Sequence, residues 1–78
     1  MGTIIFTDQD IFDNRNKIVS RLKEIREEKG FSQEQIADLM KVSRTTVSKI
    51  ESGKFNCSLD YLSKFSFVLG FKIDLVCE

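Results

Sequence analysis

Apolar residues in the first half of the chain recur at spacings of three and four, the period of a helix that buries one face. Residues 14–29 predict the first such helix, with charged residues on its opposite side. Asp13 is placed to cap its start, and Gly30 to end it, because glycine accepts the left-handed conformation just beyond a helix. The apolar residues that share the predicted buried face are Ile18, Leu22 and Ile25.

Two short helices are predicted next, each beginning after a serine. Ser32 and Gln35 have the spacing of a capping box, in which each side chain binds the other residue's backbone N–H. Ser43 caps the following helix, Arg44 to Ser52, and the chain must turn near Lys41. Helices joined by so short a turn pack at a steep angle, which places apolar residues at fixed positions. These positions are held by Ile36, Ala37, Met40, Val42, Val47 and Ile50.

The pattern changes at the two ends of the chain. A fourth helix is predicted between Ser58 and Gly70, with apolar residues again three and four apart. Residues 71–75 then alternate apolar and polar, and residues 3–7 are mostly β-branched or aromatic, both of which are typical of strands. Short isolated strands are unstable. We therefore expect these strands to pair with each other or with a second copy of the chain.

The 78 residues are enough for one domain, which we divide into a segment 1–13, a helical domain 14–70 and a tail 71–78. The formal net charge is zero, but the charges are unevenly distributed. Residues 1–13 carry three acids and no base, whereas residues 14–29 carry six bases and three acids. Such a locally basic middle is compatible with a phosphate-binding face.

The sequence lacks the signatures of common enzyme and metal sites. The chain has no histidine, and Cys57 and Cys77 are too far apart in sequence for a zinc-binding pair. Gly53 and Lys54 lack the upstream glycine of a phosphate-binding loop. No apolar run is long enough to span a membrane, and no signal peptide is evident. We expect a cytoplasmic protein with reduced thiols, no metal, no cofactor and no enzymatic activity.

Two segments resemble a known family. Phe31-Ser-Gln-Glu-Gln-Ile-Ala37 and Val42-Ser-Arg-Thr-Thr-Val-Ser-Lys-Ile-Glu-Ser-Gly-Lys54 are similar to the Cro/C1-type (XRE) helix-turn-helix regulators. The resemblance covers roughly residues 17–70 and implies a compact all-α, lambda-repressor-like domain of four or five helices that binds double-stranded DNA. The chain departs from the usual pattern at Lys41, where the left-handed turn position is commonly glycine.

The resemblance also implies roles for individual residues. The helix that starts at Arg44 is expected to lie in the major groove with its first residues facing the bases. The implied base-reading residues are Arg44, Thr45, Ser48 and Lys49. The implied phosphate contacts are Gln33, Ser43, Ser52, Lys54 and the backbone near Phe55. Arg26 and Glu51 resemble the family's internal ion pair, and we expect their role to be structural. Simpler roles stay open, Arg44 as an exposed helix residue and Ser43 as a cap.

The C-terminal segment distinguishes among members of such a family. Residues 71–76 are similar to the ending of HipB-like antitoxins, in which a short strand pairs across the dimer axis. The residues expected at such a homodimer interface are Leu62, Phe65, Leu69, Phe71, Ile73 and Leu75. Alternatively, the last three fold back onto their own helices. Three functions follow: a repressor that binds an inverted-repeat operator, an antitoxin that also binds a toxin protein, and a protein-interaction module without DNA binding.

Overall fold

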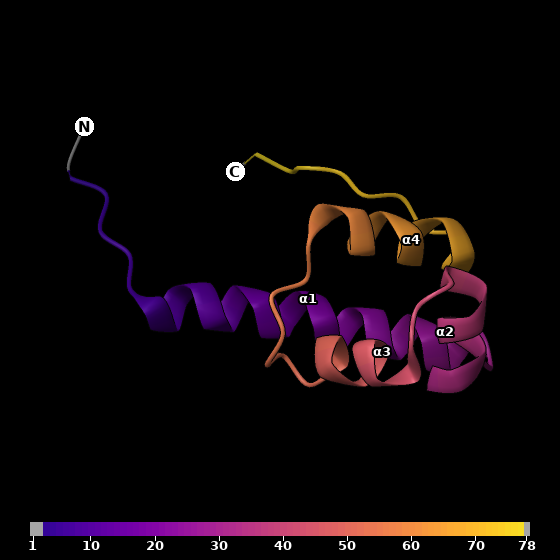
Figure 1. Ribbon diagram of the computed structural model, residues 1–78. Helices are drawn as coiled ribbons and strands as arrows, with labels where there is room; N and C mark the ends of the chain where they lie inside the picture. The colour runs from indigo at the N-terminus through magenta and orange to yellow at the C-terminus, as the bar shows by residue number, and fades with distance from the viewer. Residues whose placement is uncertain (1–2, 78) are drawn as a thin grey trace.

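The computed structural model describes residues 3–77, which contain four helices. They are α1 (Asp8–Glu28), α2 (Gln33–Met40), α3 (Arg44–Glu51) and α4 (Leu59–Leu69) (Figure 1). The described residues contain no strand, so the predicted all-α fold with four helices is confirmed. Residues 1, 2 and 78 of the predicted terminal segments lie outside the described part of the chain.

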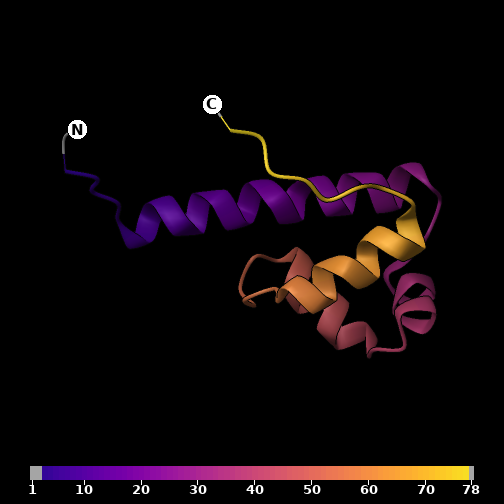
Figure 2. The ribbon, with the colours of Figure 1, turned by 90° about the horizontal axis from the view of Figure 1, so that it is seen from above.

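Helices α3 and α4 pack against α1, helix α2 packs against α3 and α4, and the N-terminal end of α1 projects beyond them (Figures 1 and 2). One apolar core joins all four helices. Every helix contributes at least two of its side chains, which explains why such a small domain can bury a continuous core. The core consists of Val19, Leu22, Ile36, Ala37, Met40, Val47, Ile50, Phe65 and Leu69.

Helix α1 begins at Asp8, so the predicted start at residue 14 is wrong. Thr7 caps the helix through a capping box: its hydroxyl accepts from the Asp10 N–H, and the Asp10 carboxylate accepts from the Thr7 N–H at 2.8 Å. Asp13, predicted as the cap, lies inside the helix and accepts a hydrogen bond from Gln9. Asp13 is also of a residue type that caps helices, so the sequence alone did not place the start of α1 at Asp8.

The buried face of α1 agrees with the prediction at Leu22 but is shifted at the positions on either side of it. Val19, Leu22 and Arg26 are buried, whereas Ile18 is 50% exposed. The apolar residues of α1 are spread over a broad part of its surface. The position of Arg26 determines which part of that surface faces the core. Burial of this arginine against its acidic partner on α3 brings Val19 into the core in place of Ile18.

The turn between α2 and α3 depends on an unusual backbone conformation at Lys41. This residue adopts φ 59° and ψ 43°, the left-handed conformation that the helix-turn-helix resemblance implied. The Val42 N–H closes the turn by donating to Ala37 O at 3.0 Å. A non-glycine residue in this conformation costs roughly 1–2 kcal/mol. The hydrogen bonds of the turn and the packing of the two helices must offset that cost.

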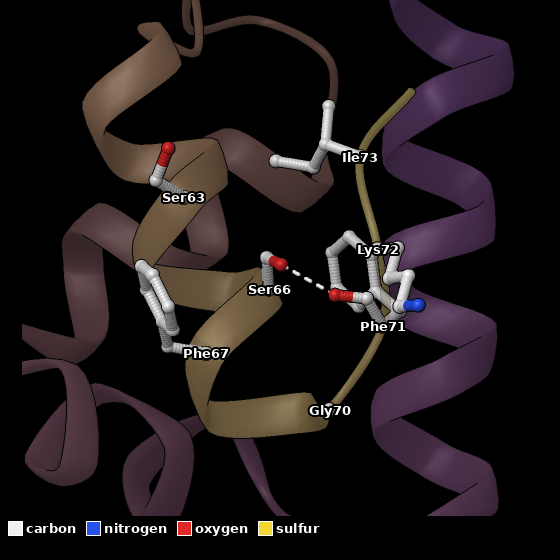
Figure 3. Close-up of a pocket in the computed structure, with 7 residues that line it drawn as sticks. All are labelled: Ser63, Ser66, Phe67, Gly70, Phe71, Lys72 and Ile73. Carbon is white, nitrogen blue, oxygen red and sulfur yellow. Dashed lines mark hydrogen bonds between the residues drawn. The ribbon is translucent and has the colours of Figure 1, made fainter.

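Residues 71–77 form no strand, so the predicted C-terminal strand is not supported in this chain. Of the three residues in the alternative prediction, Phe71 folds back and packs against the core of its own chain, whereas Ile73 and Leu75 are exposed. The Phe71 N–H donates to Ser66 O, and the Ser66 hydroxyl donates to Phe71 O (Figure 3). Residues 3–7 likewise form no strand.

Two residues predicted at the dimer interface belong to the core of the single chain. Phe65 is fully buried and Leu69 is 2% exposed, so neither side chain is available to a partner. Helical spacing did not distinguish a face that covers the chain's own core from one that covers a second copy. Of the remaining predicted interface residues, Leu62 is half-buried, and Ile73 and Leu75 are 46% and 94% exposed.

Candidate nucleic-acid interface

Helix α2 is held in place at its first turn by the predicted capping box. The Ser32 N–H donates to the Gln35 side-chain oxygen at 2.8 Å, and the Gln35 N–H donates to the Ser32 hydroxyl at 3.1 Å. Phe31, just before the cap, packs against the core. These contacts fix the direction in which α2 leaves α1 and therefore the position of the turn that leads to α3.

Helix α3 has one buried seam and one exposed polar face. Val47 and Ile50 are fully buried, which orients the helix against α1 and α2. The opposite face exposes the four residues that the resemblance assigns to base reading: Arg44, Thr45, Ser48 and Lys49. Among residues 3–77, no ion pair involves either of the two cations on this face. Their charges are therefore available to an external ligand.

Ser43 caps α3, as the simpler interpretation of this residue held. Its hydroxyl accepts from the Thr46 N–H at 3.1 Å and shares a 2.8 Å hydrogen bond with the Thr46 hydroxyl. Thr46 is half-buried and so packs beside the cap. Ser43 is nevertheless exposed, at the end of α3 that a DNA groove would meet first.

The turn that follows α3 carries the other residues assigned to phosphate contacts. The Ser52 hydroxyl donates to Lys49 O at 2.7 Å and accepts from the Lys54 N–H at 3.3 Å. Lys54 is exposed, whereas Phe55 is half-buried and meets Tyr61 edge to face with 6.1 Å between ring centroids. The aromatic contact fixes the turn to α4, so its backbone is presented in a defined conformation.

The same turn is fixed to α1 by two residues that the sequence analysis did not single out. Arg15 Nη1 donates to Gly53 O at 3.2 Å. Asn16 lies so close to Gly53 that a Cβ there would be 2.0 Å from its side-chain oxygen. Gly53 is therefore required both for its φ of 77° and for this close approach. Arg15 and Asn16 come 38 and 37 positions before Gly53, and no local sequence pattern predicts contacts over such a separation.

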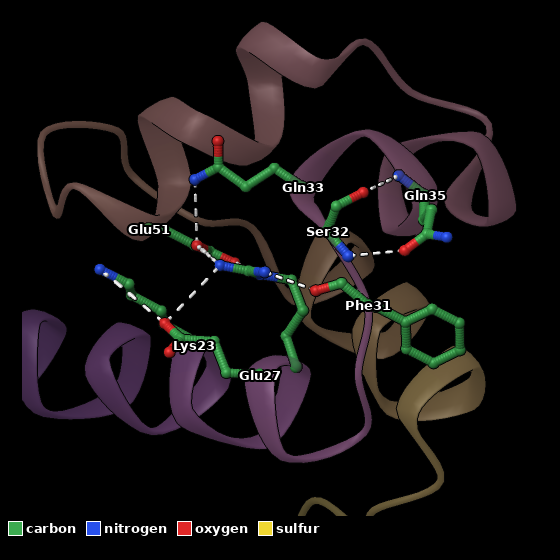
Figure 4. Close-up of polar contacts among 8 residues, drawn as sticks. Lys23, Glu27, Phe31, Ser32, Gln33, Gln35 and Glu51 are labelled. Atoms are coloured by element: carbon green, nitrogen blue, oxygen red, sulfur yellow. Dashed lines mark hydrogen bonds and ion pairs between the residues drawn. The ribbon is translucent and has the colours of Figure 1, made fainter.

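Arg26 and Glu51 form the ion pair that the resemblance implied (Figure 4). Arg26 Nε donates to Glu51 Oε2 at 2.7 Å and Nη2 donates to Glu51 Oε1 at 3.0 Å, a bidentate geometry. The two side chains are 8% and 3% exposed. The hydrogen bond to Glu51 raises the pKa of Arg26, against the opposing effect of burial.

The ion pair also orders the connections around it. Arg26 Nη1 donates to Phe31 O at 2.6 Å, and Gln33 Nε2 donates to Glu51 Oε1 at 3.2 Å. One carboxylate thus links α1, the start of α2 and the end of α3 (Figure 4). Gln33 retains a second amide hydrogen, because the side-chain amide has two donors. That hydrogen can serve the phosphate contact predicted for this residue.

The geometry of α2, the turn and α3 can now be compared with known proteins. The family model described as helix-turn-helix matches residues 22–76. The chain belongs to the helix-turn-helix family. Proteins of this family are DNA-binding regulators rather than enzymes, and the resemblance seen in the sequence is confirmed.

A curated helix-turn-helix relative and a solved structure agree with this family assignment. The chain is 39% identical over 58 residues to the SPbeta prophage-derived uncharacterized HTH-type transcriptional regulator YonR of Bacillus subtilis (strain 168). The match covers 74% of this chain but only 54% of that protein, so it spans about half the length of the relative. The restriction-modification controller protein C.AhdI from Aeromonas hydrophila aligns with a TM-score of 0.73 and 35% identity, over 77% of this chain and 91% of that one.

The described residues offer neither a cluster of metal ligands nor a helix suited to a membrane. Residues 3–77 contain no group of three or more histidine, cysteine, aspartate or glutamate side chains that could hold a metal ion. In the same part of the chain, no helix combines the length and the apolar character that a membrane crossing needs.

The two cysteines are expected to differ in reactivity. Cys57 is half-buried, and this burial raises the pKa of its thiol, whereas Cys77 is exposed. Since the thiolate is the reactive form, Cys77 should be alkylated by iodoacetamide well before Cys57 in the native protein. Mass spectrometry of peptides from timed samples measures both rates, and the difference should disappear in denaturant. Equal rates in the native protein would contradict the burial of Cys57.

Proposed function

We propose that the protein is a transcriptional repressor that binds an inverted-repeat operator as a homodimer. The observation that carries this proposal is the exposed face of α3, which presents two unpaired cations and two hydroxyl side chains on a helix fixed by a buried seam. An exposed polar face with this composition, at the second helix of the motif, is the part of such a domain that enters the major groove.

Base reading begins at the N-terminus of α3. Arg44 can donate two hydrogen bonds to O6 and N7 of guanine, a contact that discriminates against other bases by about 1–3 kcal/mol. Thr45 offers a methyl group suited to thymine and a hydroxyl group, and Ser48 offers a hydroxyl alone. Lys49, one turn further along α3, can reach guanine or a phosphate oxygen. We assign base recognition to these four exposed residues.

Phosphate contacts flank this helix on both sides. We assign them to Gln33 and Ser43 ahead of α3, and to Ser52, Lys54 and the backbone near Phe55 beyond it. Such contacts set the position of the protein on the duplex and carry no sequence information of their own. The contacts of Arg15 and Phe55 support this role, because they hold the second set of groups rigidly.

A homodimer would place its two recognition helices on half-sites about 34 Å apart, one turn of the double helix. Such a regulator acts on the chromosome, and we therefore place it in the cytoplasm. We rank the antitoxin function behind repression, because the HipB-like resemblance depended on a C-terminal strand and residues 71–77 form none in this chain. The protein-interaction module without DNA binding is disfavoured by the two unpaired cations on α3.

The test is a salt titration of binding to a duplex from the region upstream of the gene. We expect the wild type to bind specifically and to weaken as salt rises, by about 0.9 in the log–log slope for each neutralised phosphate. Arg44→Ala should lose about 5- to 150-fold in affinity for this duplex, the equivalent of about 1–3 kcal/mol, and little for an unrelated duplex.

The matched control is Lys72→Ala, which removes an exposed cation from the segment after α4 instead of from α3. It should bind nearly as the wild type does. If the wild type binds every duplex equally and weakly, and Arg44→Ala changes nothing, DNA recognition through α3 is wrong.

A further inference from the structure

The projecting half of α1 carries apolar side chains that the domain itself leaves uncovered. Residues 3–21 precede the stretch that the family model matches. Within them Ile11 is 46% exposed and Ile18 is 50% exposed. The two residues are seven positions apart, about two helical turns, so they lie on the same side of α1. We call Ile11 and Ile18 the stripe. These two side chains take no part in the DNA contacts proposed for α3.

The stripe borders an open groove of about 280 Å³ between α1 and the start of α4. Leu59, on the α4 side, is 77% exposed. Contiguous exposed apolar surface is a common feature of interaction sites. The apolar residues that line the groove are Ile11, Ile18, Val19, Cys57, Leu59 and Leu62.

The charges beside the stripe indicate which kind of partner would bind over it. Residues 3–13 carry three acids and no base, a net charge of −3, and residues 14–21 carry three bases and no acid, a net charge of +3. Asp10 and Lys17 are themselves seven apart, each one residue before a stripe isoleucine, and both are exposed. Among the described residues Lys17 takes part in no ion pair. This surface is complementary in charge to a copy of itself running in the opposite direction.

We propose that a second copy of the chain docks here, with the two projecting halves of α1 packed antiparallel about a twofold axis. Each acidic end then faces the partner's basic end, and the axis makes every contact twice. Asp10 of each chain then meets Lys17 of the other, and these two contacts lie along one flank of the isoleucine seam, at its two ends. The proposal rests on the homodimer of the proposed function and gives it an interface.

The position of this interface suits a DNA-binding dimer. The projecting half of α1 lies at the end of the molecule where the turn after α3 lies (Figure 1). A copy docked there leaves the exposed face of α3 uncovered. It would also bring the two turns after α3 toward the centre of the dimer and leave the two α2 helices at its outer ends.

The test reverses one charge at a time and follows mass by sedimentation equilibrium at low salt. Wild type should be dimeric. Lys17→Asp and Asp10→Lys should each weaken self-association by roughly tenfold or more, since each places like charges opposite one another. An equimolar mixture of the two variants should associate again, because the mixed pair is complementary in both contacts. Added salt should weaken the mixed pair.

The matched control is Asp38→Lys, the same change on the exposed side of α2. On its own, this variant should dimerise as the wild type does. When it is mixed with Asp10→Lys, it should not bring the Asp10→Lys chains into dimers. Circular dichroism verifies that Asp10→Lys stays helical, since Asp10 also belongs to the capping box. If the wild type and all variants are dimers, the interface lies elsewhere although the homodimer stands. If the wild type is a monomer, both the interface and the dimer are wrong.

Discussion

Replacing Glu51 with alanine is expected to destabilise the protein by about 3–5 kcal/mol. The change leaves Arg26 buried and charged, with Phe31 O and the more distant Glu27 carboxylate, 3.9 Å away, as its remaining partners. A domain of 78 residues has roughly 4–12 kcal/mol of stability in all, so this loss would remove a large share of that stability. Urea denaturation followed by circular dichroism measures the difference.

Two controls separate burial from charge in this experiment. Glu24→Ala breaks the Arg21–Glu24 pair, which is also 2.9 Å long but 59% and 60% exposed, and should cost no more than about 0.5 kcal/mol. The double variant Arg26→Met, Glu51→Leu removes both charges and should recover most of the lost stability. If Glu51→Ala unfolds at the same urea concentration as Glu24→Ala, the ion pair does not stabilise the fold as its burial implies.

Gly53→Ala is expected to have the second-largest effect. Alanine at a φ of 77° costs roughly 1–2 kcal/mol. The added methyl also meets the oxygen at the end of the Asn16 side chain, which must rotate away from its present position, and an off-rotamer side chain costs about 0.5–1.5 kcal/mol more. Since the turn carries Ser52 and Lys54, specific DNA affinity should fall with stability. Thermal unfolding and the operator titration measure the two effects.

Gly30→Ala supplies the matched control, because Gly30 has nearly the same φ, 80°, with no atom within 4 Å of the new Cβ. It should lose only the conformational part. Adding Asn16→Ala to Gly53→Ala removes the obstructing oxygen and should return the variant to the level of Gly30→Ala. An equal loss in the two single glycine variants would show that the contact with Asn16 is unimportant.

The sequence was sufficient to locate the features that depend on near neighbours. Ser32, Ser43 and Ser58 each cap the predicted helix, because a serine hydroxyl reaches the N–H three residues ahead. The start of α1 was missed for the same kind of reason. Thr7 and Asp13 both have capping character, and only the fold shows that the helix continues past Asp13.

Features that depend on contacts between residues far apart in the sequence were harder to predict. Arg15 and Asn16 fix the turn at Gly53 through contacts that have no periodic or motif signal. The alternation of residues 71–75 has the pattern of a strand, but a strand forms only where a neighbouring strand accepts its hydrogen bonds, and this chain supplies none among residues 3–77. Family resemblance supplied the Arg26–Glu51 pair, which spacing alone would not have revealed.

Helix α1 is continuous over 21 residues, so it extends about 31 Å without a hinge. Its C-terminal half holds α3 through Arg26, and its N-terminal half contacts the turn at Gly53 through Arg15 and Asn16 before its free end projects beyond the other helices (Figure 2). Anything bound to the free end is therefore held at a fixed distance and rotation from α3. An operator with one base pair added between half-sites turns the second site by roughly 35°. In the proposed dimer a rigid helix cannot follow that rotation, so α1 would restrict the spacing of half-sites that the protein binds.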